Sequence, residues 1–231
     1  MSRRLQPFLW APVFALCSAC NDADQQEKHI SSSNVVFLNY RVTAEEGKDS
    51  VTCFFEFREG TAAGKTILWP GEGPKLDGKS VKADSAMFTG IFYEVRRPVA
   101  GFNGTHVVSF TDANGVERKQ TFEFFSFRLK REIPPEQPKG PFTIHIDLPG
   151  KESTVHLMMI DTSFASNDVN ETVHVKEGKL LVTAAMLANL SPGPIFMELF
   201  KQDDVAVTET GLRGKIIVTY GLRREFGLKA N

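Results

Sequence analysis

The stretch Gly104-Thr-His-Val-Val-Ser-Phe-Thr-Asp-Ala-Asn-Gly-Val-Glu-Arg-Lys-Gln-Thr-Phe-Glu-Phe124 decides the fold class of this chain. Side chains alternate between two faces over His106–Phe110 and again over Gln120–Leu129, which is the period of a β-strand. Between these runs, Asp112–Gly115 ends in an Asn-Gly pair, and glycine takes the positive φ that a tight turn requires. The stretch therefore predicts a β-hairpin.

The same alternation recurs along the rest of the chain. It begins at Val36–Val42 and returns in the second half at Phe142–Leu148, Val155–Met159 and Gly214–Tyr220. Short strands between clusters of turn-forming residues, with no convincing amphipathic helix, are typical of all-β sandwiches. We therefore expect an all-β protein.

One segment interrupts the pattern and marks a domain boundary. Residues 132–141 contain four prolines, and proline cannot serve in a central strand because it lacks the backbone N–H. We expect this segment to be an extended, semi-rigid linker. The predicted domains are then a β-sandwich over 34–131 and a second β-sandwich over 142–231.

Two short features resemble known extracellular modules. Leu187-Ala-Asn-Leu-Ser-Pro-Gly-Pro194 resembles the loop before a late strand in immunoglobulin-like and prealbumin-like modules. Thr111-Asp-Ala-Asn-Gly115 resembles the last hairpin of the same modules. The resemblance implies two tandem immunoglobulin-like β-sandwich domains, and it implies nothing about activity.

The first residues read as an export signal. Arg3 and Arg4 precede the apolar run Phe8–Leu16, and Cys17-Ser-Ala-Cys20 follows it. The run is shorter than the roughly 20 apolar residues of a transmembrane helix. A positive start, a short apolar run and small residues before the cleavage point make a signal peptide over residues 1–19.

The tetrapeptide Cys17-Ser-Ala-Cys20 resembles the bacterial lipobox. That resemblance implies cleavage after Ala19 and attachment of lipid, with acyl chains such as palmitate, to Cys20. The alternative is an ordinary secreted protein cut at the same bond. In lipoproteins of the enterobacterial type an Asp after the cysteine favours the inner membrane, so Asn21 favours the outer membrane over the inner, in a periplasmic or surface-facing position.

The residues after Cys20 are polar and rich in serine. With Cys20 included, residues 20–33 are predicted to form a lipidated, flexible tether because they hold almost no core-forming side chains. Cys53 then has no cysteine to pair with, and its place on the apolar face of Val51–Phe57 predicts a buried, inert thiol. The formal net charge of −1 offers no basic face for nucleic acid.

Two groups of residues are candidate sites. If Pro149–Glu152 is a hairpin turn, His145 lies opposite His156 with Asp147 nearby, and these could hold a zinc-type ion. Cross-strand histidines on a polar face are more often bystanders, so no metal is predicted. Trp69 stands among turn-forming residues, where a core-capping role is favoured and a ligand contact is the alternative.

No serine-hydrolase elbow, phosphate loop or metalloprotease motif occurs. The sequence therefore predicts a lipid-anchored cell-envelope protein that is not an enzyme, needs no cofactor, and binds or scaffolds another envelope protein or surface ligand. One alternative is an envelope hydrolase with a metal or carboxylate site. The other is an architectural spacer, which is expected if neither domain shows a concave site.

Overall fold

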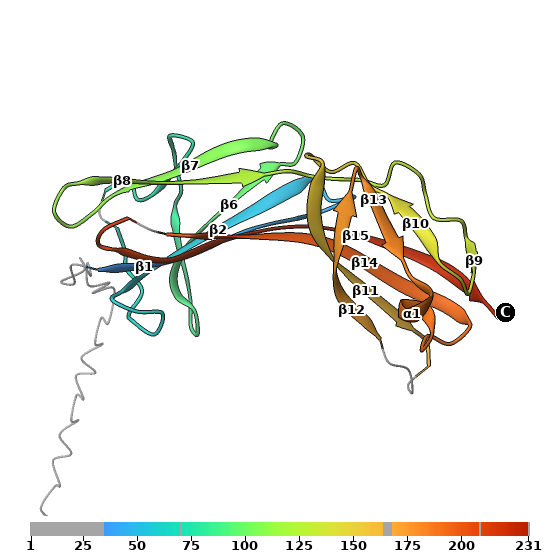
Figure 1. The fold of residues 1–231 in the computed structure, drawn as a ribbon. Coiled ribbons are helices and arrows are strands. Elements are labelled where there is room, and N and C mark those ends of the chain that lie inside the picture. The colour runs from blue at the N-terminus through green and yellow to red at the C-terminus, as the bar shows by residue number, and fades with distance from the viewer. Residues whose placement is uncertain (1–34, 70, 164–167, 208, 231) are drawn as a thin grey trace, which may run out of the picture.

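The computed structural model describes residues 35–69, 71–163, 168–207 and 209–230 and arranges them in two lobes joined by a long hairpin (Figure 1). Among these residues, strands account for nearly all regular structure and the helical part is a single short turn. The predicted all-β class is confirmed. The leader and the whole of the predicted tether, including Cys20, lie outside the described residues.

The first lobe is built from the first half of the chain and from the ends of two later strands. Its own strands are β1 (Val36–Glu45), β2 (Ser50–Glu59), β3 (Lys75–Leu76), β4 (Lys79–Ser80), β5 (Ala83–Ala86), β6 (Gly90–Pro98), β7 (Gly104–Thr111) and β8 (Glu117–Phe124). Strands β7 and β8 form the predicted hairpin, in which Gly115 has a φ of +78°.

The second lobe follows in the chain and contains the helix. Its elements are β9 (Glu136–Pro138), β10 (Phe142–His145), β11 (Glu152–Asp161), β12 (Val169–Lys176), β13 (Lys179–Val182) and α1 (Ala184–Leu187). Two long strands complete the structure, β14 (Gly193–Ala206) and β15 (Leu212–Lys229). No helix of the described residues is long and apolar enough to cross a membrane.

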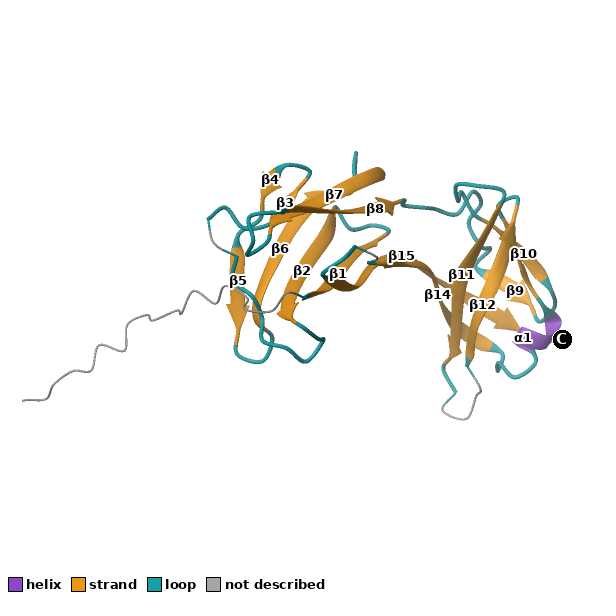
Figure 2. Cartoon of the chain, turned by 60° about the vertical axis from the view of Figure 1, so that its left-hand side comes forward, coloured by secondary structure: helices purple, strands orange, loops and turns teal. Residues whose placement is uncertain are grey.

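Two sheets organise these strands. The larger has 11 strands in the order β10-β13-β12-β11-β14-β15-β1-β2-β6-β5, with β9 beside β15, and the smaller has the order β4-β3-β7-β8. The small sheet covers the first-lobe part of the large one, which makes a sandwich (Figure 2). Its core is aromatic: Phe57 packs edge-to-face on Trp69, Tyr93 and Phe110, with ring centroids 5.4, 5.7 and 4.9 Å away.

In the second lobe the large sheet curls around a core of its own. Every second residue points inward, so that Ile144, Leu157, Leu180, Met197 and Leu222 are all 2% exposed or less. These five side chains come from β10, β11, β13, β14 and β15. The strict alternation in the sequence is therefore explained by burial of one face of each strand.

The hairpin of β14 and β15 belongs to both lobes. Strand β15 runs parallel to β1 from Leu212 to Gly221 and then parallel to β9 from Gly227 to Lys229, while β14 lies antiparallel beside it. Figure 1 shows the hairpin passing from one lobe into the other. The predicted division at 132–141 therefore needs correction, because the end of the second predicted domain completes the sheet of the first.

The predicted linker is also more than a connector. Its residues Glu136–Pro138 form β9, which pairs with the end of β15. Strand β9 lies off the main path of the sheet, with β15 as its partner. An edge position suits this segment because proline cannot donate to a second neighbouring strand.

Candidate functional site

The two candidate metal-site histidines lie on strands that are not paired with each other. His145 on β10 stands opposite Lys179 on β13, whereas His156 on β11 stands between Thr172 and Phe200. The His156 ring stacks on Phe200 at 4.8 Å, and its Nδ1 lies 3.2 Å from the Thr172 hydroxyl. The expected cross-strand pair is therefore wrong.

The reason is that β10 pairs with β13 rather than with the next strand along the chain. The Ile146 N–H donates to the Gly178 carbonyl at 2.8 Å, and a Cβ on Gly178 would lie 2.6 Å from the Ile146 oxygen. Because Gly178 has no side chain, β13 can approach β10 this closely. Asp147 instead lies 3.8 Å from both Arg128 and Lys130. Within the described ranges, no group of three or more His, Cys, Asp or Glu side chains could hold a metal ion.

Trp69 is a core residue and not a ligand contact. It is 5% exposed, and its ring packs against Phe57 and Phe110. Its backbone N–H donates to the Tyr93 hydroxyl at 2.8 Å. This burial agrees with the favoured core role, and the alternative of a ligand contact at the surface does not hold. Cys53 is buried as predicted, and burial raises the pKa of its thiol to about 12.

A cleft of about 720 Å³ lies where the two lobes meet. Its walls are the end of β8, the end of β14 and the turn between β10 and β11. The side chains that matter for its chemistry are Glu123, Phe125, Glu152, Lys201, Asp203 and Val205. We take this interlobe cleft as the candidate functional site.

One wall of the interlobe cleft is an open strand edge. Strand β11 pairs with β14 from Asp161–Ile195 to His156–Phe200, and β14 then continues to Ala206 beside β15 alone. In the part of the chain that the structure describes, no strand lies on the other side of residues 201–206. Such an edge presents backbone N–H and C=O groups that can pair with another chain.

The opposite wall is a second open edge. Strand β8 is the last strand of the smaller sheet and pairs with β7 on one side only, as far as the described strands go. Phe125 follows β8 and Val205 lies on β14, and each is 37% exposed. Exposed apolar side chains beside two open edges are what an added strand with alternating apolar residues requires.

The charges in the interlobe cleft are mainly acidic. Glu123, Glu152 and Asp203 contribute three carboxylates, and Lys201 contributes one ammonium group. Lys201 forms an ion pair with Asp203, and Glu152 lies 4.0 Å from Lys176. The balance favours a basic ligand over an acidic one.

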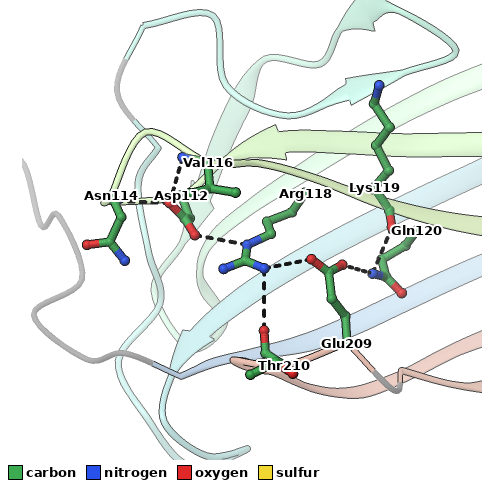
Figure 3. Close-up of polar contacts among 8 residues, drawn as sticks. All are labelled: Asp112, Asn114, Val116, Arg118, Lys119, Gln120, Glu209 and Thr210. Atoms are coloured by element: carbon green, nitrogen blue, oxygen red, sulfur yellow. Dashed lines mark hydrogen bonds and ion pairs between the residues drawn. The ribbon is translucent and has the colours of Figure 1, made fainter.

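An ion-pair network joins β8 to the turn between β14 and β15 (Figure 3). Arg118 on β8 donates to Glu209 at 2.7 Å and to the Thr210 carbonyl at 3.4 Å, both in the β14–β15 turn. Gln120 donates to the same Glu209 at 2.9 Å, and Arg118 also donates to Asp112 at 2.9 Å. The network thus ties the smaller sheet to the β14–β15 hairpin of the larger one.

The carboxylate of Asp112 is held ionised in this network. Burial alone would raise its pKa, but hydrogen bonds from the Val116 N–H, Arg118 and the Asn114 N–H outweigh burial and lower the pKa. The hydrogen bonds to Glu209 and Asp112 raise the pKa of Arg118. Both partners therefore keep their charges, which suits a structural ion pair rather than a proton-transfer group.

Sequence reasoning did not find the interlobe cleft, although β14 carries a sign of it. The inward positions of β14 are apolar at Ile195, Met197 and Leu199 and then become polar at Lys201 and Asp203, with no change of period. Polar side chains on the inner face indicate that this part of the strand no longer lines the core of the second lobe. This pattern can be recognised only once the strand is known to continue.

Comparison with known proteins assigns this chain to no family. No protein-family model and no curated protein matches the sequence. Among solved structures, the crystal structure of DIP-gamma IG1+IG2 is similar at 7% identity, over 84% of this chain and 96% of that one, with a TM-score of 0.21. At this level the likeness says nothing about function, and only the site bears on it.

Proposed function

We propose that this protein is a lipid-anchored, non-catalytic binding module of the bacterial cell envelope, which holds an extended segment of another envelope protein in the interlobe cleft. The observation that carries the proposal is the pair of open strand edges, one on β8 and one on β14, that face the cleft. Strand addition gives affinity through main-chain hydrogen bonds and specificity through alternate side chains.

The side chains of the cleft define the segment it would accept. Alternate apolar residues would pack on Phe125 and Val205, and basic residues would face Glu123, Glu152 and Asp203. Charges at the rim of an interface act mainly on association rate and partner choice. The acidic groups would therefore contribute more to the choice of ligand than to the affinity for it.

The proposed location in the cell envelope rests on the sequence. Cys20 at the end of the lipobox-like tetrapeptide would carry the lipid, and the segment before Val35 would tether the first lobe to the membrane. The outer membrane is the proposed location because Asn21, not Asp, follows the cysteine. Metabolic labelling with a fatty-acid analogue tests the anchor: label on the wild type and none on Cys20→Ala supports it, and no label on either refutes it.

The binding site is tested with a displayed library of random peptides selected on the full mature chain. Selected peptides should alternate apolar and other residues and contain Lys or Arg. Replacing one rim carboxylate, in Asp203→Lys or Glu152→Lys, should weaken the selected peptides about fivefold, the equivalent of about 1 kcal/mol.

Glu171→Lys is the matched control, because Glu171 is an exposed carboxylate on β12 outside the cleft. It makes the same charge change and should leave binding unaltered. Equal losses in all three variants would mean that net charge and not the cleft governs binding. Peptides without alternation that bind every variant equally would exclude strand addition at this site.

A further inference from the structure

The turn between β5 and β6 presents two large apolar side chains to solvent. Met87 is 91% exposed and Phe88 is 97% exposed, which makes them the most exposed large hydrophobic residues of the described chain. The turn from Ala86 to Gly90 carries no charged residue. A side chain of this kind at a projecting tip is available to a partner and contributes nothing to the core.

The tip is held in place by the fold. Gly90 has a φ of +77°, and a Cβ there would lie 2.6 Å from the Thr66 hydroxyl oxygen. The Ile91 N–H donates to the same hydroxyl at 3.0 Å. Glycine is therefore required at Gly90 both for the turn and for the approach to Thr66, and the exposure of Met87 and Phe88 follows from a defined hairpin.

The tip lies at the end of the first lobe where the chain enters from its N-terminal segment. The Gly60 N–H donates to the Val35 carbonyl at 2.9 Å, and Arg58 bridges to Thr66 in the neighbouring segment. Thr66 in turn contacts the base of the β5–β6 turn. Figure 2 shows β5 on the side of the first lobe away from the second lobe.

The chain between the proposed anchor and this end is short. Residues 21–34 separate Cys20 from Val35, and an extended chain covers at most about 3.5 Å per residue, so Val35 stays within about 50 Å of the anchored cysteine. An apolar tip at this end is therefore within reach of the bilayer while Cys20 is lipidated.

We infer that the Met87–Phe88 tip is a second membrane contact, which dips into the lipid surface when the chain is anchored at Cys20. The inference rests on the anchor proposed above. The two contacts together would orient the first lobe on the bilayer and point the interlobe cleft away from it. The chemical partner is the apolar boundary of a lipid bilayer, where an aromatic ring and a flexible thioether are both accepted.

The test uses tryptophan as a local probe in the full mature chain. The wild-type chain without its leader has Trp69 alone, which is buried and gives a constant background. Phe88→Trp places a second indole at the tip. Leu181→Trp is the matched control, because Leu181 is an exposed apolar residue on β13 in the second lobe, 54% exposed.

Each protein is coupled through Cys20 to a maleimide phospholipid in vesicles of equal parts phosphatidylethanolamine and phosphatidylglycerol, with or without brominated acyl chains. Cys53 is buried and does not compete for the reagent. In the Phe88→Trp protein, the emission of the tip indole should move to shorter wavelength and lose at least half its intensity to the brominated lipid. In the Leu181→Trp protein, the control indole should be quenched only by aqueous iodide.

Equal iodide quenching of the tip indole and the control indole would overturn the inference. Shielding of the tip indole from iodide without quenching by brominated lipid would also overturn it, and would indicate a protein contact such as a second copy of this chain. A failure of the anchor is separate: it appears as missing fatty-acid label in cells, and it leaves this measurement intact because the lipid is attached chemically.

Discussion

Two tyrosines in the core of the first lobe should respond in opposite directions to the same substitution. Tyr40 and Tyr93 both pack edge-to-face on Phe57, with ring centroids 5.4 and 5.7 Å away. The Tyr93 hydroxyl accepts a hydrogen bond from the backbone N–H of Trp69 at 2.8 Å. The Tyr40 hydroxyl is buried and has no hydrogen-bond partner among the described residues. We predict that Tyr40→Phe stabilises the protein and that Tyr93→Phe destabilises it.

The magnitudes follow from the cost of an unmet hydrogen bond. A buried hydroxyl without a partner costs about 1–3 kcal/mol, and removing it leaves a void of about 12 Å³ that costs about 0.3 kcal/mol. Tyr40→Phe should therefore gain about 1–3 kcal/mol. Tyr93→Phe leaves the backbone N–H of Trp69 without its acceptor and should lose about 1–3 kcal/mol.

The assay is urea unfolding followed by the fluorescence of Trp69, which lies in the same core and reports this lobe directly. The two variants should differ by about 2–6 kcal/mol in the free energy of unfolding, and by about 5–14 °C in Tm for a chain of this size. Destabilisation of both variants by similar amounts would refute the reasoning, because it would mean that the Tyr40 hydroxyl is satisfied in the folded protein.

Three further predictions concern other parts of the molecule. Gly214→Ala should cost about 3 kcal/mol or more in the free energy of unfolding measured in urea, because Gly214 has a φ of +112° and a Cβ there would lie 2.0 Å from the Leu38 carbonyl oxygen on the paired strand. The free energy of unfolding should fall below about pH 4. Hydrogen bonds from Arg224 to Glu132 and from Lys215 to Asp204 lower the pKa of each carboxyl group in the folded protein. The stability that these ion pairs contribute is therefore present above the pKa of the unfolded chain and is lost as the pH falls through the pKa of the folded protein. Arg224→Gln should flatten the acid limb of a melting-temperature profile, and an unchanged limb would contradict the assignment. Cys53 should resist a chromogenic disulfide reagent at pH 8 until the protein unfolds, because burial raises the pKa of its thiol to about 12; rapid reaction of the folded Cys20→Ala variant would show that Cys53 is accessible.

Local features of the sequence predicted the parts of the fold that depend on neighbouring residues. The Asn-Gly pair before Val116 predicted the turn of the β7–β8 hairpin, because the conformation of a short turn is decided by the residues within it. Period-two alternation predicted the buried face of β1 and the burial of Cys53 on β2. Each of these predictions depends only on the alternation of side chains along a single strand or on the residues of one turn.

Pairing between distant strands was beyond such reasoning. The parallel pairing of Val36 with Leu212 joins opposite ends of the chain, and nothing near either residue specifies the other. The error with His145 and His156 has the same origin: a Pro-Gly turn does not say whether the flanking strands pair, and β10 took β13 as its neighbour. The core role favoured for Trp69 was right, but the turn formers around it did not indicate that it packs on Phe57.

The length of β14 and β15 explains both the union of the lobes and the existence of the interlobe cleft. Strand β15 supplies Ile216 and Val218 to the core of the first lobe, and Tyr220 packs on Phe127 at 5.2 Å, so a chain ending at residue 131 would lack part of its own core. Its partner β14 stays paired with it from Gly193 to Ala206, and β14 therefore runs past the end of its contact with β11 at Phe200. The edge that remains open is a direct consequence of joining the lobes by pairing rather than by a linker. A rigid open edge loses less entropy on binding than a flexible one, and for this reason the junction is the place where we expect a partner to bind.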